Sequence, residues 1–378
     1  MTHTQTPVVL VMAGGTGGHI FPALAVADVL KRHGAQIHWL GTHKGMEARL
    51  IPEYHYPIHF IEIDGLRGKG IKTLITMPFK LLKALWQTFG VYRKIKPNVV
   101  LGMGGFVTGP GGLMAWMLAK PLVVHEQNAI AGLTNKLLYR LAKKVFAAFP
   151  GAFKAAPKLT VCGNPVRQEI VAIEAPETRL QQHWQQYPGQ LNILVVGGSL
   201  GAMALNKTIP QALELIVQKQ MLTQSDFTSI KVKHQCGEKH QSETEQAYQL
   251  LSGPVNKNID YEVMPFIKNM AETYAWADVI ICRSGALTVS EIAAAGIASV
   301  LVPFPYAVDD HQTANGAYLA DQDAAVLIQQ RDLDKQKLAQ LLADLSREKI
   351  TAMSVQARKL SITDAAEVVA QECLSLAG

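Results

Sequence analysis

Glycine-rich loops supply the first residues in this chain that could do chemistry. Residues 14–19 read Gly-Gly-Thr-Gly-Gly-His and lie between a short apolar run and a helical pattern. Glycines let the backbone approach a bulky anion or sugar, and the following helix offers unpaired N–H groups and the positive end of its dipole. A turn without a ligand needs only one or two glycines, so the pattern favours a site for pyrophosphate or a negatively charged acceptor.

The same loop does not fit a dinucleotide site. A fold that binds NAD would show G-x-G-x-x-G and an acidic residue at the end of its second strand. This chain has G-G-T-G-G instead, and its second apolar run ends in Leu-Gly-Thr-His at residues 40–43. NAD binding is therefore disfavoured, and we expect no cofactor.

The second half of the chain contains two similar loops. Residues 197–201 read Gly-Gly-Ser-Leu-Gly, which is typical of a phosphate site but also of a packed turn. Residues 282–291 read Cys-Arg-Ser-Gly-Ala-Leu-Thr-Val-Ser-Glu, again at a transition from strand to helix. Glu291 falls about two turns into that helix, too far along to cap it. Its carboxylate could accept two ribose hydroxyls or be a solvated helix charge, and the spacing leaves these alternatives open.

Two polar clusters follow apolar runs, at the strand ends where open α/β sheets build their sites. His-Glu-Gln-Asn at residues 125–128 contains more polar residues than a simple turn needs, which favours a site. Asp-Asp-His-Gln-Thr-Ala-Asn at residues 309–315 could bind a metal, but such a run equally caps a helix. The four cysteines form no ligand spacing, so we expect a reducing compartment and no metal.

The net charge of +6 is unevenly distributed. Residues 65–125 contain no Asp or Glu and carry +9, so the rest of the chain carries −3. Within this segment, apolar residues at helical spacing alternate with basic ones, which suits a helix lying on an anionic membrane surface. The alternative is a core-packed helix with solvated lysines. The predicted membrane residues are Lys72, Ile75, Phe79, Lys80, Leu82, Lys83 and Trp86.

Three further expectations concern this region and the ends of the sequence. Pro78 should divide the basic helix or start it at Phe79. The uncharged residues 99–119 contain six glycines and a proline, so we expect strand, loop and helix there in place of a membrane span. No basic lead-in precedes the apolar residues 8–13, which argues against a signal peptide. Without an RNA-binding or helix-turn-helix motif, nucleic acid is the weaker partner for the basic segment.

The elements that must position these loops alternate between strand and helix. With 48% hydrophobic and 17% charged residues, the chain is not disordered. Its length predicts two domains, and the two glycine loops lie one domain length apart. We predict an α/β protein of two Rossmann-like, doubly wound domains that face each other across a cleft. The predicted strands are residues 8–12, 36–40, 58–63, 99–101, 122–125 and 144–147, then 193–196, 230–234, 260–263, 279–282 and 299–302.

Domain boundaries and helices follow from the same pattern. The first domain should span residues 1–165, ending at a Gly-Asn-Pro turn, and the second residues 166–359. A last helix within residues 360–378 could pack back onto the first domain. Other predicted helices are residues 23–32, 204–217 and 287–295.

Taken together, the motifs resemble a known family. They are residues 13–19, 65–70, 102–105, 125–128, 163–167, 197–199 and 276–291, which occur in order across both halves. Their combination resembles the MurG family of bacterial peptidoglycan N-acetylglucosaminyltransferases. The resemblance implies a GT-B fold and inverting transfer of N-acetylglucosamine from UDP-GlcNAc to the muramyl 4-hydroxyl of lipid I, giving lipid II, without a bound metal.

The resemblance also implies partners, a location and site residues. Lipid I, an anionic phospholipid surface and other cell-wall synthesis proteins would be partners at the cytoplasmic face of the inner membrane, in a process that serves cell shape and division. The matching Glu is the family's ribose ligand. The positions that match donor contacts are Thr16, Gly17, Gly18, Asn128, Arg167, Ser199, Ile267, Ala286, Leu287, Thr288, Val289, Ser290, Glu291 and Gln312.

The catalytic base is predicted from chemistry. His19 is our first choice because an imidazole titrates near neutral pH, and Glu126 is the second; His19 could instead only position the acceptor. Leu200 and Phe106 stand where the family usually has Gln and Tyr, so we place no catalytic role on either. Two alternatives remain, namely another GT-B UDP-sugar transferase with a soluble acceptor and a non-catalytic nucleotide-sugar binder.

Overall fold

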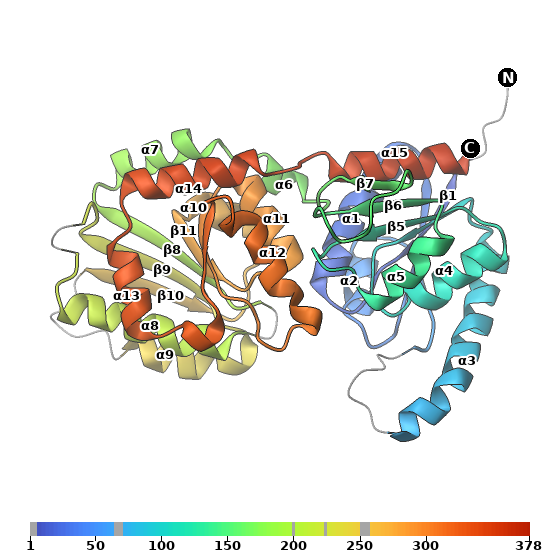
Figure 1. The fold of residues 1–378 in the computed structure, drawn as a ribbon, viewed down its shortest axis with the longest axis horizontal. Helices are drawn as coiled ribbons and strands as arrows, with labels where there is room; N and C mark the ends of the chain where they lie inside the picture. The colour runs from blue at the N-terminus through green and yellow to red at the C-terminus, as the bar shows by residue number, and fades with distance from the viewer. Residues whose placement is uncertain (1–5, 64–70, 199–200, 223–224, 250–257) are drawn as a thin grey trace. The chain divides into compact units, whose positions relative to one another are not determined.

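The computed structural model describes residues 6–63, 71–198, 201–222, 225–249 and 258–378 (Figure 1). The chain divides into two compact units. Unit 1 comprises Met1–Arg167 together with Ile362–Gly378, and unit 2 comprises Gln168–Ser361. Ser199 and Leu200, two positions singled out above, lie outside the described residues.

Unit 1 is built on a parallel sheet of seven strands in the order β3-β2-β1-β4-β5-β6-β7. Its central strands are buried on both faces, which explains why they read as unbroken apolar runs. The strands are β1 (Val8–Met12), β2 (Gln36–Gly41), β3 (Ile58–Phe60), β4 (Val99–Gly102), β5 (Leu122–Glu126), β6 (Lys144–Ala147) and β7 (Leu159–Val161).

Two hydrophobic cores cover the two faces of this sheet. On β1, Val9 and Val11 pack with α1 and α15, whereas Leu10 and Met12 pack into the core that includes residues of α3, α4 and α5. The alternation follows from the two-residue period of a strand. The helices of unit 1 are α1 (Gly17–Arg32), α2 (Glu47–Glu53), α3 (Ile71–Ile95), α4 (Thr108–Met117), α5 (Leu133–Leu141) and α15 (Ala365–Ala377).

Unit 2 repeats this architecture with six parallel strands in the order β10-β9-β8-β11-β12-β13. The strands are β8 (Gln190–Val196), β9 (Ser229–Gln235), β10 (Ile259–Met264), β11 (Val279–Cys282), β12 (Ala298–Leu301) and β13 (Ala325–Leu327). The helices are α6 (Gln168–Val171), α7 (Pro176–Gln186), α8 (Met203–Gln218), α9 (Gln241–Gln249), α10 (Met270–Trp276), α11 (Ala286–Ala295), α12 (His311–Ala320), α13 (Lys335–Ala343) and α14 (Arg347–Lys359).

The doubly wound prediction is confirmed in both units. In each sheet the strand order reverses beside the first strand, between β1 and β4 and between β8 and β11. Three of the loops that leave these strands are the glycine-containing loops predicted from the sequence, and the fourth, after β4, contains the glycine motif of residues 102–105. This topological switch point is where open α/β sheets bind ligands.

Three details of the predicted elements were wrong. The helix α3 runs without a break through Pro78, and α1 begins at Gly17, with Pro22 inside it. A proline removes one N–H from a helix and crowds the preceding turn. Pro78 is exposed, so water can hydrate the carbonyl left without a partner there, whereas Pro22 is buried within α1. Strands β7 and β13 were missed because each has only three residues and is partly exposed at a sheet edge. The predicted change from strand to loop to helix over residues 99–119 is confirmed by β4 and α4.

Candidate functional site

The first glycine loop of unit 1 connects β1 to α1. Thr16 is the N-cap residue of α1, but its hydroxyl does not cap the helix, and the first turn of α1 contains no acidic residue. Gly15 is exposed and has a φ of +92°, a conformation that favours glycine. The N–H groups of Gly17 and Gly18 therefore stand at an uncapped helix N-terminus, where an anion is favoured.

His19 lies half-buried at the start of α1, against the loop that follows β4. A Cβ atom on Gly104 would come within 2.5 Å of His19 Cδ2, so only glycine allows this approach. The Gly104 loop is itself fixed, because Thr108 Oγ1 donates to the Gly104 carbonyl at 2.8 Å and Gln127 Nε2 donates to the Met103 carbonyl at 2.7 Å. The imidazole is thus held by packing between two glycine loops.

Glu126 ends β5 and is 2% exposed. Its Oε1 accepts from the backbone N–H of Asn128 at 3.0 Å, and its Oε2 accepts from the Gly132 N–H at 3.1 Å and from Asn135 Nδ2 at 2.8 Å. The Asn128 side chain also donates to Oε1 at 3.2 Å. Because both oxygens are engaged within the loop, the geometry suits Glu126 to holding Asn128 in place better than to receiving a proton.

Two neighbouring residues of unit 1 support the same strand ends. Burial lowers the pKa of His125 to about 4, so its ring is neutral at pH 7, and its Nε2 lies 2.9 Å from the Gly163 carbonyl oxygen. The guanidinium of Arg167 lies over the ring of Phe21, 5.3 Å from its centroid, which brings this predicted donor contact onto α1. The structure thus brings Thr16, Gly17, Gly18 and His19 together with Arg167, through the α1 helix.

The second glycine loop, between β8 and α8 in unit 2, is fixed by a side chain that sequence reasoning missed. Gln235, at the end of β9, accepts from the Gly198 N–H at 3.0 Å and donates to the Gly198 carbonyl at 3.0 Å. Its Nε2 also donates to the Pro265 carbonyl at 3.0 Å. The N-terminus of α8 has no side-chain cap and no acidic residue in its first turn. The sequence signal that could have identified Gln235 is its position at the end of a predicted strand.

The third loop places residues 286–291 at the N-terminus of α11. This helix also begins without a side-chain cap or a first-turn acid, whereas α10, α13 and α14 are capped by Asn269, Asp334 and Ser346. Leu287, Thr288 and Ser290 are half-buried, and the hydroxyl of Ser290 donates to the Ala286 carbonyl at 3.1 Å. Val289 is 0% exposed and Ala286 8%, so these two could contact a ligand mainly through their backbones.

Glu291 is the sixth residue of α11 and is 5% exposed. Its Oε2 accepts a hydrogen bond from the hydroxyl of Tyr274, on α10, at 3.0 Å. The alternative of a solvated helix charge is therefore wrong for this residue. A buried carboxylate with a fixed orientation is suited to accept hydroxyl groups. Tyr274 was missed because α10 and α11 come together only in the folded unit.

The last predicted donor contact of unit 2, Gln312, is the second residue of α12 and holds the loop that precedes this helix. Gln312 Oε1 accepts from the Phe304 N–H at 2.9 Å, and Arg283 donates to the Val302 and Pro303 carbonyls at 3.1 Å each. Arg283 was also missed. Ile267, predicted for the same pocket, is 6% exposed and can offer mainly backbone atoms.

The Asp-Asp-His run lies at the start of α12. Asp310 is the N-cap residue of that helix and accepts from Thr313 Oγ1 at 2.7 Å. No group of three or more His, Cys, Asp or Glu side chains with the spacing of a metal site occurs within the described parts of the chain.

The exposed face of α3 is apolar. Phe79, Leu82 and Trp86 are 74%, 63% and 76% exposed, while the opposite face buries Ala84, Thr88 and Tyr92. The alternative of a core-packed helix therefore explains the buried face of α3 but not its exposed apolar residues. Lys80 is exposed, whereas Lys83 forms an ion pair with Glu62 at 2.7 Å. Lys72 and Ile75 lie on α3, but their side chains are outside the described part.

Further exposed apolar residues lie on helices next to α3. Helix α3 packs against α4, and α4 packs against α5. Trp116 and Met117, at the end of α4, are 56% and 59% exposed, and Leu133 and Leu137, on α5, are 65% and 62% exposed. Sequence reasoning missed these four residues. Among the helices of the described ranges, none is both long and apolar enough to span a membrane.

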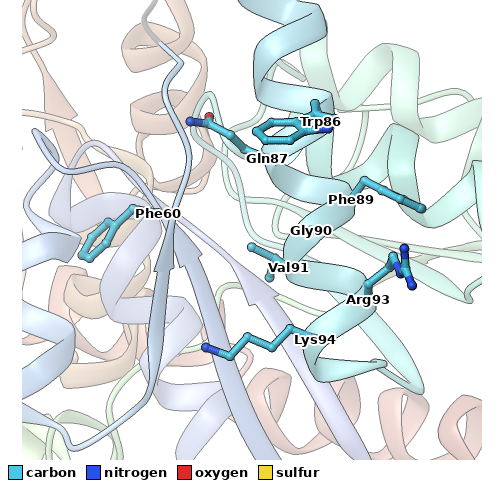
Figure 2. Close-up of a pocket in the computed structure, with 8 residues that line it drawn as sticks. All are labelled: Phe60, Trp86, Gln87, Phe89, Gly90, Val91, Arg93 and Lys94. Carbon is cyan, nitrogen blue, oxygen red and sulfur yellow. The ribbon is translucent and has the colours of Figure 1, made fainter.

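An open groove of about 470 Å³ lies at the C-terminal end of α3 (Figure 2). Gln87 and Lys94 point toward the side of Phe60, on β3, whereas Phe89 and Arg93 turn to the other side of the helix (Figure 2). The Arg93 guanidinium lies 5.9 Å from the centroid of the Phe89 ring. The side of α3 that carries Phe89 thus ends at one cation, Arg93, and Lys94 lies on the side of Phe60.

Comparisons with known families match both halves of the chain. Residues 9–147 match the glycosyltransferase family 28 N-terminal domain, and residues 192–371 match the glycosyltransferase family 28 C-terminal domain. The two matches correspond to the sheets of unit 1 and unit 2.

Individual relatives match over the full length. The chain is 50% identical to a UDP-N-acetylglucosamine–N-acetylmuramyl-(pentapeptide) pyrophosphoryl-undecaprenol N-acetylglucosamine transferase of Aeromonas hydrophila, over 99% of this chain and 98% of the relative. A protein of the same name from Marinobacter nauticus is 48% identical over 100% and 99%. The crystal structure of Acinetobacter baumannii MurG superposes with a TM-score of 0.81 at 42% identity, covering 98% of this chain and 99% of that one.

Proposed function

We propose a function from the family to which this chain belongs, glycosyltransferase family 28 and, within it, the MurG group of enzymes. The enzyme transfers N-acetylglucosamine from UDP-GlcNAc to the muramyl 4-hydroxyl of undecaprenyl-pyrophosphoryl-MurNAc-pentapeptide. The reaction converts lipid I into lipid II in peptidoglycan synthesis. The full-length identity with enzymes named for this transfer supports both the reaction and its two substrates.

The donor half of the proposal rests on one observation in unit 2, the buried Glu291 two turns into a helix whose N-terminus is uncapped. A nucleoside diphosphate needs partners for a ribose and for a charged pyrophosphate. The Glu291 carboxylate suits the ribose hydroxyls, and the N-terminal amides of α8 and α11 suit the phosphates. Ser199 would add a hydroxyl to this set. Ile267 and Gln312 complete the proposed pocket with the N-terminal residues of α11.

The reaction needs a hydroxyl to become nucleophilic while UDP leaves. The muramyl 4-oxygen attacks C1 of the sugar, the bond from C1 to the phosphate oxygen breaks with its electron pair, and the configuration at C1 inverts. Negative charge that develops on UDP is met by fixed N–H groups of the helix N-termini. Preorganised donors of this kind are typically worth about 3 kcal/mol each in the transition state.

The proton of the attacking hydroxyl needs a base, and we assign this role to His19. Its ring is held against Gly104 at the start of α1, beside the exposed Thr16 and Gly18 and the half-buried Gly17, whose backbone would bind the substrates. Glu126 remains the second candidate, although its four hydrogen bonds suit it to positioning Asn128.

Unit 1 is proposed to receive the lipid-linked acceptor at a membrane surface. The exposed apolar residues of α3, α4 and α5 would enter the interface, and the basic residues of the acid-free segment would meet anionic headgroups. We propose that the enzyme lies peripherally on the cytoplasmic face of the inner membrane, where other cell-wall synthesis proteins would be further partners.

The deciding experiment is a transfer assay with radiolabelled UDP-GlcNAc and a lipid I analogue, with and without a metal chelator. We expect labelled disaccharide product that survives chelation. Product formed only with soluble sugar acceptors would support a different GT-B transferase. Binding of UDP-GlcNAc without any product would instead indicate a non-catalytic binder, and the proposed reaction would be wrong.

A further inference from the structure

Beneath the first glycine loop lies a carboxylate that the proposed reaction does not use. Glu47, the first residue of α2, is 0% exposed. Its Oε2 accepts from the Gly15 N–H at 2.9 Å, and its Oε1 accepts from both the N–H and the hydroxyl of Thr42, each at 2.9 Å. No Lys, Arg or His forms an ion pair with it among the residues that the structure describes. Three donors from Gly15 and Thr42 thus engage both oxygens of the carboxylate.

Three glycines make room for this side chain. A Cβ atom on Gly14 would come within 2.6 Å of Glu47 Oε1, and one on Gly41 within 2.6 Å of Glu47 Cγ. A Cβ atom on Gly45 would collide with the carboxylate directly. These glycines come from the first loop, the end of β2 and the turn before α2. The carboxylate is thus enclosed by backbone, which leaves it one orientation.

The bond to Gly15 determines where the loop amides point. Gly15 has a φ of +92°, and its N–H is turned inward to Glu47 while the residue itself is exposed. The next residues are the N-cap Thr16 and the uncapped amides of α1. A carboxylate that holds Gly15 inward therefore also holds the backbone of residues 16–19 outward.

We propose that Glu47 is a positioning residue for the transfer reaction, which fixes the first glycine loop so that Thr16, Gly17, Gly18 and His19 meet the substrates. The inference rests on the proposed function for the reaction. That Glu47 fixes the loop follows from its own hydrogen bonds, whatever the reaction is. In dinucleotide folds an acidic residue near this strand end binds the ligand ribose. Here the carboxylate instead accepts hydrogen bonds from the enzyme's own backbone and from Thr42.

The variant Glu47→Gln tests this role because it keeps the size and removes one acceptor. Glutamine has a single carbonyl oxygen, so an NH₂ group must face either the Gly15 N–H or the two Thr42 donors. We expect the transfer rate to fall by about 10²-fold, the scale on which a misplacement of 1 Å acts. We also expect faster amide hydrogen exchange in a peptide covering residues 13–19. Glu53→Gln, at the exposed end of the same helix, should change neither quantity.

UDP alone provides the second control, because the groups proposed to bind its ribose and phosphates, Glu291 and the N-termini of α8 and α11, lie in unit 2. Calorimetric affinity for UDP and the melting temperature of unit 2 should match the parent. Unchanged exchange at residues 13–19, or faster exchange with an unchanged transfer rate, would overturn the inference. If Glu47→Gln does not fold, Thr42→Val removes one donor to Oε1 and should give a smaller change in the same direction; no change would count against the role.

The two proposals can fail separately. A parent enzyme that transfers no sugar to the lipid I analogue would refute the proposed function. Hydrogen exchange of residues 13–19 in Glu47→Gln would still decide whether Glu47 fixes the loop.

Discussion

At the scale of single residues, the site depends on buried carboxylates whose neighbours decide what each can do. Glu126 and Glu47 accept three or more hydrogen bonds within their own loops, and both therefore hold backbone in place. Glu291 receives a hydrogen bond from Tyr274 and sits two turns beyond an uncapped helix N-terminus. Residue type alone does not distinguish these roles.

Replacing His19 tests its role as the base. We expect His19→Ala to lower kcat by about 10²-fold or more, because general-base catalysis typically contributes about 10²–10⁴-fold, with a smaller change in the KM for the acceptor. Steady-state transfer assays measure both. His55→Asn is a suitable control, since His55 is exposed and its φ of +59° suits asparagine. Near-normal kcat with a raised acceptor KM would show that His19 only positions the acceptor.

Removing the Glu291 carboxylate should weaken donor binding. Because each hydrogen bond to a charged group contributes about 1.5–3 kcal/mol, Glu291→Ala should raise the Kd for UDP-GlcNAc about tenfold or more. Tyr274→Phe removes only the donor to Oε2 and should have a smaller effect in the same direction. Isothermal calorimetry measures both, with Glu262→Ala, an exposed carboxylate on β10, as the control. Equal affinity in Glu291→Ala would contradict the ribose assignment.

At the scale of helices and strands, the sequence predicted elements well where one local rule applied and poorly where two competed. The central strands were located to within a few residues because unbroken apolar runs indicate strands buried on both faces. Pro78 was predicted to divide or start a helix, and the first helix was predicted to begin at residue 23, but α3 and α1 each continue through a proline at the loss of one hydrogen bond. The edge strands β7 and β13 lack a pattern long enough to detect.

The charge of α3 can be reversed to test its contact with membranes. Because each basic residue near an anionic leaflet contributes about 1 kcal/mol, changing Lys72, Lys80 and Lys83 to Glu should weaken binding to anionic vesicles by about 10²-fold or more. Vesicle sedimentation measures this, and the affinity for UDP-GlcNAc should stay the same. The matched control changes three exposed lysines of unit 2, Lys335, Lys337 and Lys349, to Glu. Equal vesicle binding by both triple variants would mean that α3 is an ordinary solvated helix.

A buried histidine links three elements of unit 2 and gives its stability a pH dependence. His234, on β9, has its Nδ1 2.9 Å from the Tyr248 hydroxyl and its Nε2 3.1 Å from Asn206 Oδ1. Burial lowers its pKa to about 3, from 6.5. The folded protein therefore disfavours the charged ring. Its contribution to stability is complete above pH 6.5 and is lost progressively as the pH falls toward 3.

The neutral variant His234→Gln isolates this effect. Between pH 7 and pH 4 the parent should lose about 3 kcal/mol of unfolding free energy relative to the variant, because 1 pKa unit corresponds to about 1.4 kcal/mol. Urea unfolding of both proteins at the two pH values measures the difference, and other titrating groups cancel. Parallel pH dependence in parent and variant would show that His234 does not titrate as described.

At the scale of the whole molecule, charge and chain path separate the two units. The acid-free segment and its +9 charge belong to unit 1, and the chain leaves unit 1 at residue 167 to return at residue 362. Both halves of the α/β architecture could be predicted from the repeated glycine loops. The contacts that fix the loops could not, since Gln235 and Gly198 lie 37 residues apart, and Glu47 and Gly15 lie 32 apart. Such pairs meet only after the sheets form.

The C-terminal helix should stabilise unit 1 and leave unit 2 unaffected. Helix α15 packs on α1 and buries Val369, Ala370 and Cys373 completely. Deleting residues 362–378 should destabilise unit 1, by about 1.5–3 kcal/mol for the loss of Val369 burial alone. Residues 168–361, expressed separately, should fold and bind UDP with the affinity of the full chain. Circular dichroism and calorimetry measure these outcomes, and a fragment that stays unfolded would show that unit 2 depends on unit 1.

The return of the chain to unit 1 also sets an order of events during synthesis on the ribosome. Residues 168–361 are contiguous, so unit 2 can complete its fold as soon as it emerges. Unit 1 is made first but must wait for α15, roughly 10 to 40 s later at the usual ~5–20 residues per second. During that interval the apolar face of α1 is not yet covered by α15. A chaperone would find its largest exposed apolar surface at that stage. The half proposed to receive the lipid-linked acceptor is therefore finished last, after the nucleotide half is complete.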